Sequence, residues 1–298
     1  HIAKEHLIPK QIKKNGLKAS NVKITDDCIY ELIDGYTKEA GVRNLEREVS
    51  SLCRKAAKEI VEENKKKVIF TAENIEKYLG PKKYLPDLLS DKNEVGIANG
   101  LAWTSVGGVL MPLEVLILDG KGSIELTGSL GEVMKESAKI AVSYVRSVTD
   151  KYSINKDFYK EKDIHIHAPE GAVPKDGPSA GVTLVTSLVS ALSGIPVRKD
   201  VAMTGEITLH GKVLPIGGLK EKTMAAYKAG IKTVIIPKLN KADLEEVDDT
   251  VKSSINFVCA ENLSEVLDTA LAFDKNENSK EMILSIPPDE RQGIQIHS

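Results

Sequence analysis

The chain has 298 residues, which exceeds the usual size of one domain and predicts two. Its 41 basic and 43 acidic side chains nearly balance, and only 4% of its residues are aromatic. This composition argues against a protein that coats nucleic acid with a basic surface or stacks bases on aromatic rings.

The remaining composition is that of an ordinary globular protein, with 41% hydrophobic and 28% charged residues. Cys28, Cys53 and Cys259 lie far apart and form no CxxC pair or disulfide framework, which favours a reducing compartment. The sequence contains no run of about 18 uncharged apolar residues, so it predicts no membrane-spanning helix. The chain opens HIAKEHLIPKQ, without an initiator Met or a signal-peptide core, so we expect a fragment of a longer protein.

Residues 1–79 are expected to be all-helical. The clearest helix covers Val42–Glu62, because its apolar residues recur at steps of three and four, as one buried stripe requires. Thr25 is a candidate N-cap for the helix before it. Considered alone, the segment predicts a small helical bundle with no chemistry of its own. The expected helices cover 4–14, 26–35, 42–62 and 71–79.

Residues 80–94 are rich in Pro, Gly and charge, which is typical of a linker. Strand and helix patterns then mix through one α/β or α+β domain over 95–273, and residues 274–298 form a polar tail. The motif Ser129-Leu-Gly-Glu132 resembles a capping box that opens a helix. Expected strands cover 109–118, 123–127, 163–167, 233–237 and 256–259, with a hairpin at 206–215; expected helices cover 132–148, 179–192, 220–229, 242–247 and 262–273.

The motif PKDGPSAG, at residues 174–181, delivers Ser179 to the first turn of an apolar helix. Unpaired N–H groups at a helix start favour negative charge, so an oxyanion formed beside Ser179 could be held there. Two other interpretations stay open. Ser179 could simply cap the helix, or the turn could bind phosphate, although no GxxxxGK[ST] occurs in the sequence.

A nucleophilic serine needs a base. His165 and His167 are candidates, but they alternate with Ile164 and Ile166 on a strand, so simple solvation is the favoured explanation for them. As metal ligands they lack a third partner at a recognisable spacing.

The second candidate base is a lysine kept neutral by burial. A rotation of about 100° per residue places Lys222 with Leu219, Ala225 and Ala226 on the small-residue face of its helix. The side chain either snorkels to solvent or has a function there. Thr204, in the motif MTGE, precedes the hairpin that leads to this helix and could share protons with the amine.

Four long motifs follow one another in the second part of the chain: GLAWTSVGG (100–108), TGSLGEVMKES (127–137), PKDGPSAG (174–181) and TGEITLHGKVLPIGGLKEK (204–222). The helical segment contains YTKEAGVRNLEREVSSLCRKAA (36–57). The four motifs together resemble the proteolytic domain of the Lon family of ATP-dependent proteases, and the helical motif resembles the lid of the family's AAA+ ATPase module.

The resemblance implies a serine endopeptidase with a Ser-Lys dyad, in which Ser179 is the nucleophile and Lys222 the general base. Thr204 matches a hydroxyl that orients the lysine. Asp176 and Gly177 lie in the loop beside the nucleophile, where Asp176 is expected to gate access. The resemblance places His165 and His167 near the site and outside the dyad.

The resemblance also implies the fold and the partners: a small all-α bundle followed by an α+β domain, assembled as a homohexameric ring. Arg43 matches a sensor of nucleotide phosphates in the full-length protein, which uses ATP with Mg²⁺ to unfold damaged and regulatory protein substrates in quality control and stress response. We expect no cofactor and no ATP hydrolysis in this fragment, and no membrane partner. The expected location is the cytoplasm or, alternatively, the mitochondrial matrix.

Two alternative functions stay open. The fragment could be a non-catalytic oligomerisation or regulatory module of the same fold, if the loop at Asp176–Ser179 blocks the site. Weak DNA association is the third possibility, and the balanced charge gives it little support.

Overall fold

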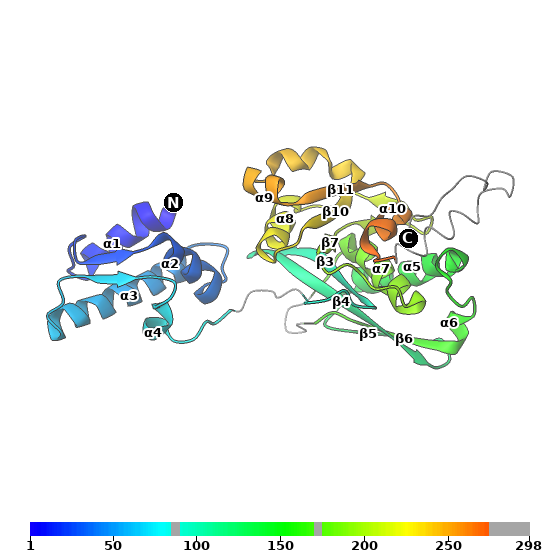
Figure 1. Cartoon of the computed structure of the whole chain (residues 1–298), viewed down its shortest axis with the longest axis horizontal. Helices are drawn as coiled ribbons and strands as arrows, with labels where there is room; N and C mark the ends of the chain where they lie inside the picture. Colours follow the sequence, from blue (N-terminus) through cyan, green and yellow to red (C-terminus); the bar gives the residue numbers. More distant parts are fainter. Residues whose placement is uncertain (85–89, 170–174, 274–298) are drawn as a thin grey trace, which may run out of the picture. The chain divides into compact units, whose positions relative to one another are not determined.

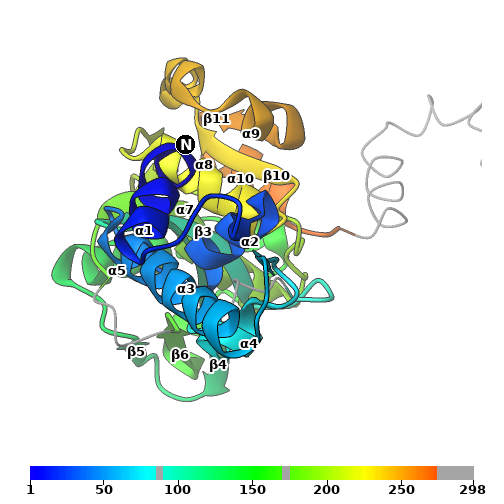
Figure 2. The ribbon, with the colours of Figure 1, turned by 90° about the vertical axis from the view of Figure 1, so that its left-hand side faces the viewer.

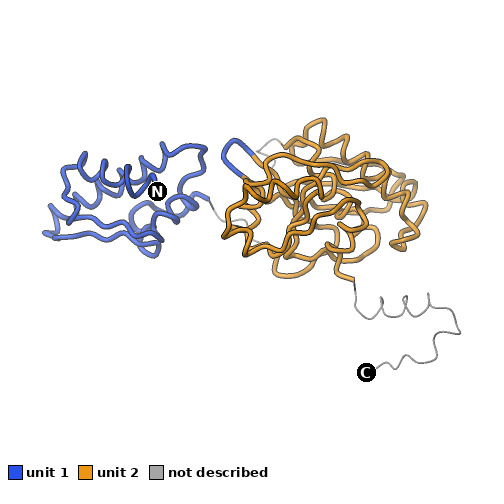
Figure 3. Tube along the Cα trace, turned by 90° about the horizontal axis from the view of Figure 1, so that it is seen from above, with its two compact units in different colours: residues 1–88, 104–107 blue, residues 89–103, 108–298 orange. Residues whose placement is uncertain are grey.

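The chain forms two compact units, residues 1–88 with 104–107 and residues 89–103 with 108–298 (Figure 3). The computed structural model describes residues 1–84, 90–169 and 175–273. Part of the expected linker, 85–89, and the expected tail, 274–298, lie outside these described residues.

The first unit is built around helix α3 (Arg43–Glu62), whose predicted apolar stripe is buried at Leu45, Val49 and Leu52. Helix α1 lies beside α3 (Figure 2). The four expected helices are present, the second continuing into a π-helical turn, η2. The elements of this unit are η1 (Ala3–Leu7), α1 (Ile8–Lys14), β1 (Val22–Ile24), α2 (Asp26–Glu31), η2 (Leu32–Tyr36), α3, β2 (Val68–Phe70) and α4 (Ile75–Leu79).

The unit also contains a two-stranded parallel sheet, β1 and β2, in the segment expected to be purely helical. Each strand has three residues, too few for an alternating pattern to stand out from a helical one. Val22, Val68 and Phe70 are buried, so the sheet belongs to the core. Thr25 precedes α2 as predicted, but its hydroxyl donates to Phe70 O at 3.0 Å and makes no cap hydrogen bond to the helix.

The second unit contains a seven-stranded mixed sheet within the described residues, in the order β11-β10-β7-β3-β4-β6-β5 (Figure 1). Strands β3, β7, β10 and β11 run parallel, β4 is antiparallel to β6, and β5 is parallel to β6. The strands are β3 (Ile97–Thr104), β4 (Gly107–Asp119), β5 (Ile124–Thr127), β6 (Lys162–His167), β7 (Val201–Met203), β10 (Thr233–Pro237) and β11 (Asn256–Ala260), with a separate hairpin of β8 (Glu206–Ile207) and β9 (Val213–Leu214).

Helices cover both faces of this sheet. Alternate residues of β10 show this: Ile235 packs in one core with α5, α7 and α10, whereas Val234 and Ile236 pack in the other with α8 and α9. The helices and turns are α5 (Glu132–Ser147), η3 (Thr149–Tyr152), α6 (Phe158–Glu161), η4 (Pro178–Ala180), α7 (Gly181–Ser193), α8 (Leu219–Lys228), η5 (Lys238–Asn240), η6 (Ala242–Glu246), α9 (Asp249–Ser254) and α10 (Leu263–Ala270). The expected α+β fold class is therefore confirmed.

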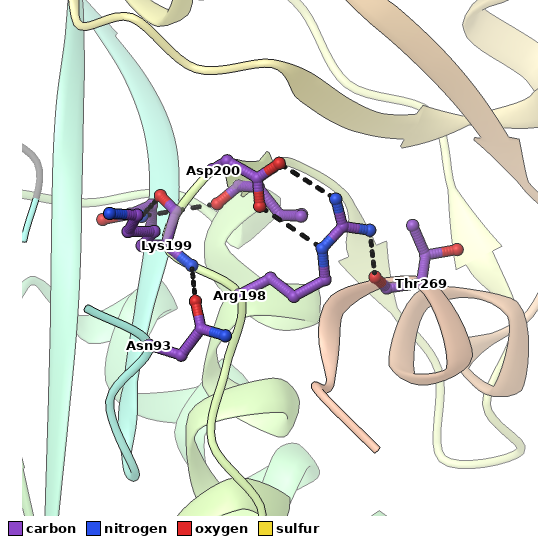
Figure 4. A network of polar contacts seen from close by, with 7 residues as sticks. Asn93, Arg198, Lys199, Asp200 and Thr269 are labelled. Atoms are coloured by element: carbon purple, nitrogen blue, oxygen red, sulfur yellow. Dashed lines mark hydrogen bonds and ion pairs between the residues drawn. The ribbon is translucent and has the colours of Figure 1, made fainter. Parts of the chain in front are cut away.

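The loop before β7 attaches the start of this unit to helix α10 (Figure 4). Lys199 N donates to Asn93 Oδ1 at 3.1 Å, near the end of the expected linker. Arg198 donates to both carboxylate oxygens of Asp200, at 3.3 and 2.9 Å, and to Thr269 O in α10 at 3.4 Å. A bidentate arginine pair fixes orientation as well as contact, so this loop holds the two ends of the unit's described chain together.

Candidate active site

The lysine singled out by its helix face, Lys222, is buried. Only 1% of it is exposed, whereas Lys220 and Lys228 on the same helix are exposed. Gly218, in the left-handed region at φ +71°, begins the helix, and Lys222 N closes the first turn with a 3.0 Å bond to Gly218 O. The predicted inward face of the helix is confirmed at this position.

Burial changes the acid–base chemistry of this amine. Loss of hydration disfavours the ammonium form and lowers the pKa of Lys222 from its ordinary 10.5 to about 8. Lys222 Nζ donates a 3.0 Å hydrogen bond to Thr204 Oγ1. Within the described residues no carboxylate pairs with Lys222, so near pH 8 a large fraction of the amine is neutral and able to accept a proton.

Thr204 connects the lysine to the serine. Its main chain follows β7 and is held by a 3.1 Å bond from Thr204 N to Ile235 O of β10. Thr204 is 1% exposed. Its hydroxyl accepts a hydrogen bond from Lys222 Nζ and donates one to Ser179 O at 3.4 Å. A neutral amine that donates one N–H to Thr204 keeps its lone pair, so the contact orients the amine and leaves it able to accept a proton.

Ser179 is fixed by its main chain and leaves its hydroxyl available. Gly205 N donates to Ser179 O at 2.8 Å, and Val182 N donates to Gly205 O at 3.1 Å, so the segment after Thr204 is bonded to both sides of the turn that carries the serine. A Cβ at Gly205 would lie 2.8 Å from Val213 and 2.9 Å from Val182, so this approach requires glycine. Gly205 is not among the predicted site residues, although its place directly after Thr204 in MTGE was a signal.

The serine side chain does not cap a helix. Gly177 and Ala180 occupy the cap positions of η4 and α7, and neither helix start receives a side-chain cap bond. Ser179 is partly exposed and lies at the second residue of η4, where N–H groups have no intrahelical acceptor. In the described part of the chain its hydroxyl forms no hydrogen bond to Lys222, and such contacts are often loose before substrate binds.

The loop before the serine is bonded to the start of α5. Asp176 Oδ1 accepts from Met134 N at 3.1 Å and from Gly177 N at 2.9 Å, and Gly177 has φ +127°. Asp176 therefore satisfies the α5 N-terminus, which corrects the predicted capping box: Gly131 is the N-cap, and Ser129 has φ +56° and lies before the helix. Pro174, in the same motif, lies outside the described residues.

The two histidines lie on β6 and share one hydroxyl. Thr127 Oγ1 lies 2.9 Å from His165 Nε2 and 2.7 Å from His167 Nδ1. His165 Nδ1 is also 3.9 Å from Glu125 Oε2. Both imidazoles are half-buried rather than simply solvated, and in the described residues neither bonds to Ser179 or Lys222.

Arg43 is the first residue of α3 in the other unit, and its side chain is exposed. The described residues contain no cluster of three or more His, Cys, Asp or Glu side chains suited to a metal ion. No helix among those residues has both the length and the apolarity that crossing a bilayer requires.

Comparison with known proteins matches both units to one family. Residues 69–273 match the family model of the Lon protease (S16) C-terminal proteolytic domain, and residues 13–69 match that of the Lon protease AAA+ ATPase lid domain.

Three curated relatives show the same kinship. The chain is 53% identical to the Lon protease of Finegoldia magna over 270 residues, 91% of this chain and 35% of that relative. It is 51% identical to Lon protease 1 of Bacillus subtilis over 274 residues, 92% of this chain and 35% of that relative. It is 53% identical to the Lon protease of Dictyoglomus thermophilum over 271 residues, 91% of this chain and 34% of that relative. The chain thus spans about a third of the length of these relatives, and it belongs to the Lon protease family.

Proposed function

We propose that this chain is the C-terminal part of an ATP-dependent serine endopeptidase, with Ser179 as nucleophile and Lys222 as general base. One observation carries the proposal: the buried Lys222 amine lies 3.0 Å from Thr204 Oγ1, and that hydroxyl also donates to the main chain of Ser179. A lysine is rarely buried without a charged partner. A role as a neutral base explains why Lys222 is buried without a charged partner.

The first half of the reaction follows from these positions. Neutral Lys222 accepts the proton of Ser179 Oγ as that oxygen attacks the peptide carbonyl. N–H groups at the start of η4 stabilise the tetrahedral oxyanion. The Lys222 ammonium then donates its proton to the leaving amine, which departs and leaves an acyl-enzyme on Ser179.

The second half repeats the proton transfers with water. Lys222, neutral again, accepts a proton from the attacking water, and the ammonium returns that proton to Ser179 Oγ when the acyl group leaves as a carboxylic acid. Base catalysis contributes roughly 10²–10⁴-fold and each oxyanion donor about 10²–10³-fold, so both parts of the site are needed.

The proposal includes partners that act through the whole protein. Arg43 is the candidate contact to nucleotide phosphates, because its guanidinium is exposed and arginine bonds phosphate oxygens in pairs. Bound ATP with Mg²⁺ would supply the energy to unfold substrates. We further propose a hexameric ring, unfolded or damaged proteins as substrates, and a cytoplasmic location.

The test uses the purified chain with a casein-like unfolded protein and a short fluorogenic peptide. Ser179→Ala and Lys222→Gln should each lower cleavage by about 10³-fold or more while the far-UV CD spectrum is unchanged. Lys220→Gln, on the exposed face of the same helix, is the matched control and should cleave normally. Undiminished cleavage by Ser179→Ala would show that the nucleophile is misassigned.

One observation supports a non-catalytic module as the second candidate: in the described residues the Ser179 hydroxyl does not bond to Lys222. A serine-directed phosphonate ester separates the two. Covalent labelling of Ser179 supports the peptidase, whereas an unlabelled serine together with absent cleavage supports the module. Binding of DNA that weakens steeply with salt would favour a nucleic-acid role.

A further inference from the structure

Asn240, the last residue of η5, is a buried polar side chain that the proposed chemistry does not use. It is 3% exposed. Its amide accepts from Ile216 N at 2.9 Å and donates to Ile216 O at 2.8 Å, so it pairs with both main-chain groups of one residue, as a neighbouring strand would. A further 2.6 Å bond runs from Asn240 Nδ2 to Asp243 Oδ2.

The three bonds fix which way the amide faces. Asp243 and Ile216 O both require the NH₂ group, and Ile216 N requires the carbonyl oxygen. Rotating the amide by 180° would place its carbonyl oxygen against Ile216 O and Asp243 Oδ2, and its NH₂ group against the N–H of Ile216. The two bonds between the Asn240 amide and the main chain of Ile216, which we call the clamp, therefore form in only one orientation of the amide.

The clamped residue directly precedes the turn that starts α8. After Ile216 come Gly217 and Gly218, the two most freely rotating residues available, and no side chain caps the helix. Gly218 O closes the first turn by accepting from Lys222 N. The two bonds from Asn240 therefore hold the main chain directly before these two glycines.

Asn240 is itself attached to the strand that holds Thr204. It comes three residues after β10 ends at Pro237, and Ile235 of β10 accepts the bond from Thr204 N. The base and its hydroxyl partner are thus fixed to one strand, Thr204 through Ile235 and α8 through Asn240. The 3.0 Å bond between Lys222 Nζ and Thr204 Oγ1 joins the two attached segments.

We infer that Asn240 is a positioning residue for Lys222, which sets the start of α8 so that the buried amine meets Thr204 and the serine. This inference rests on the proposed function. It predicts that loss of the clamp lets α8 shift, which lengthens the contact with Thr204 and admits water to the amine. The base then becomes both misplaced and harder to deprotonate, because a hydrated lysine regains an ordinary pKa.

The test compares wild type with Asn240→Ala in the whole chain, using Lys241→Ala at the exposed neighbouring position as the matched control. The measurements are kcat and KM on the fluorogenic peptide, and the rate of Ser179 labelling by the phosphonate ester from pH 6 to 11. We expect Asn240→Ala to lower kcat and the labelling rate about 10- to 100-fold, with KM changed less than about twofold. The midpoint of its pH profile should move upward, and Lys241→Ala should match wild type.

If Asn240 only stabilised the fold, Asn240→Ala would lower the unfolding temperature without changing kcat or the midpoint of the pH profile. If Asn240→Ala, corrected for the fraction folded, keeps the wild-type kcat and midpoint, the inference is wrong. If Asn240→Ala does not fold, Asn240→Ser, which offers a single hydroxyl in place of the separate oxygen and nitrogen of the amide, is measured by the same criteria. Failure of the proposed function is distinct: the wild type itself would then show no Ser179-dependent reaction.

Discussion

Lys222 imposes a free-energy cost on folding that its chemistry explains. The folded protein holds the amine at a pKa of about 8, while in the unfolded chain it returns to 10.5. The unfolded state therefore binds more protons between these values, so the cost is fully present below about pH 8, falls as the pH rises to 10.5 and is absent above it.

Because burying this amine costs free energy, replacing it should stabilise the fold, whereas replacing an ordinary buried side chain destabilises it. Lys222→Met, which keeps the length of the side chain without its charge, should abolish cleavage and raise the free energy of unfolding at pH 7 by about 1–3 kcal/mol. The gain should shrink as the pH approaches 10.5. Urea denaturation at pH 7 and pH 10 measures both values. An equal loss of stability at the two pH values would show that the lysine is not buried as an amine.

The candidate site could be predicted from sequence where its residues follow a local pattern. The rotation of α8 separated Lys222 from Lys220 and Lys228, and the structure agrees. Asn240 could not be found in this way, because its bonds reach back 24 residues to a main chain and have no periodicity.

At the scale of elements, β4 packs against the start of α8. Gly108 lies so close that a Cβ there would be 1.9 Å from Glu221 O and 3.0 Å from Lys222 N. The obstacle is main chain and cannot rotate away, so only glycine allows the helix and the strand to meet here.

Gly108→Ala should therefore displace α8 and with it Lys222. We expect a loss of about 2 kcal/mol or more in unfolding free energy together with a large loss of peptide cleavage. Gly217→Ala is the matched control, since a Cβ there meets nothing within 4 Å. Thermal unfolding and peptide kinetics of both variants provide the comparison. Equal behaviour of the two would argue against a close strand–helix contact.

Most elements were predictable from periodicity, but the strands β3 and β7 were missed. In β3 the buried positions 98 and 100 hold Ala and Gly, so its sequence shows no apolar alternation, and β7 has three residues that are all buried. The capping box predicted at residues 129–132 does not form, because the carboxylate of Asp176 accepts the hydrogen bond from Met134 N near the start of α5. Asp176 lies 42 residues further along the chain, outside any local pattern.

At the scale of the whole molecule, the two units have separate cores. The core of the first contains Leu52 and Phe70, and among the residues that the structure describes neither core of the second includes one before Ala98. Composition and length predicted two domains, and family resemblance was needed to assign their roles, because a helical stripe carries no information about nucleotide or peptide bonds.

Separate cores predict separate unfolding. Leu52→Ala in the first unit removes a fully buried side chain and should cost about 2–5 kcal/mol. We expect differential scanning calorimetry to show one of two transitions moved to lower temperature. Ser179 labelling at a temperature between the two transitions should proceed at the wild-type rate. A single transition accompanied by loss of labelling would mean that the units fold as one.

The pH dependence of Ser179 labelling tests most directly whether a neutral buried lysine activates the serine. The second-order rate constant for the phosphonate ester is measured from pH 6 to 11 in wild type and in Lys222→Met. We expect the wild-type rate to rise with a midpoint near pH 8, the pKa of Lys222, and the rise to vanish in the variant. A wild-type rate that is flat over this range, or a rise that survives in Lys222→Met, would contradict a lysine base.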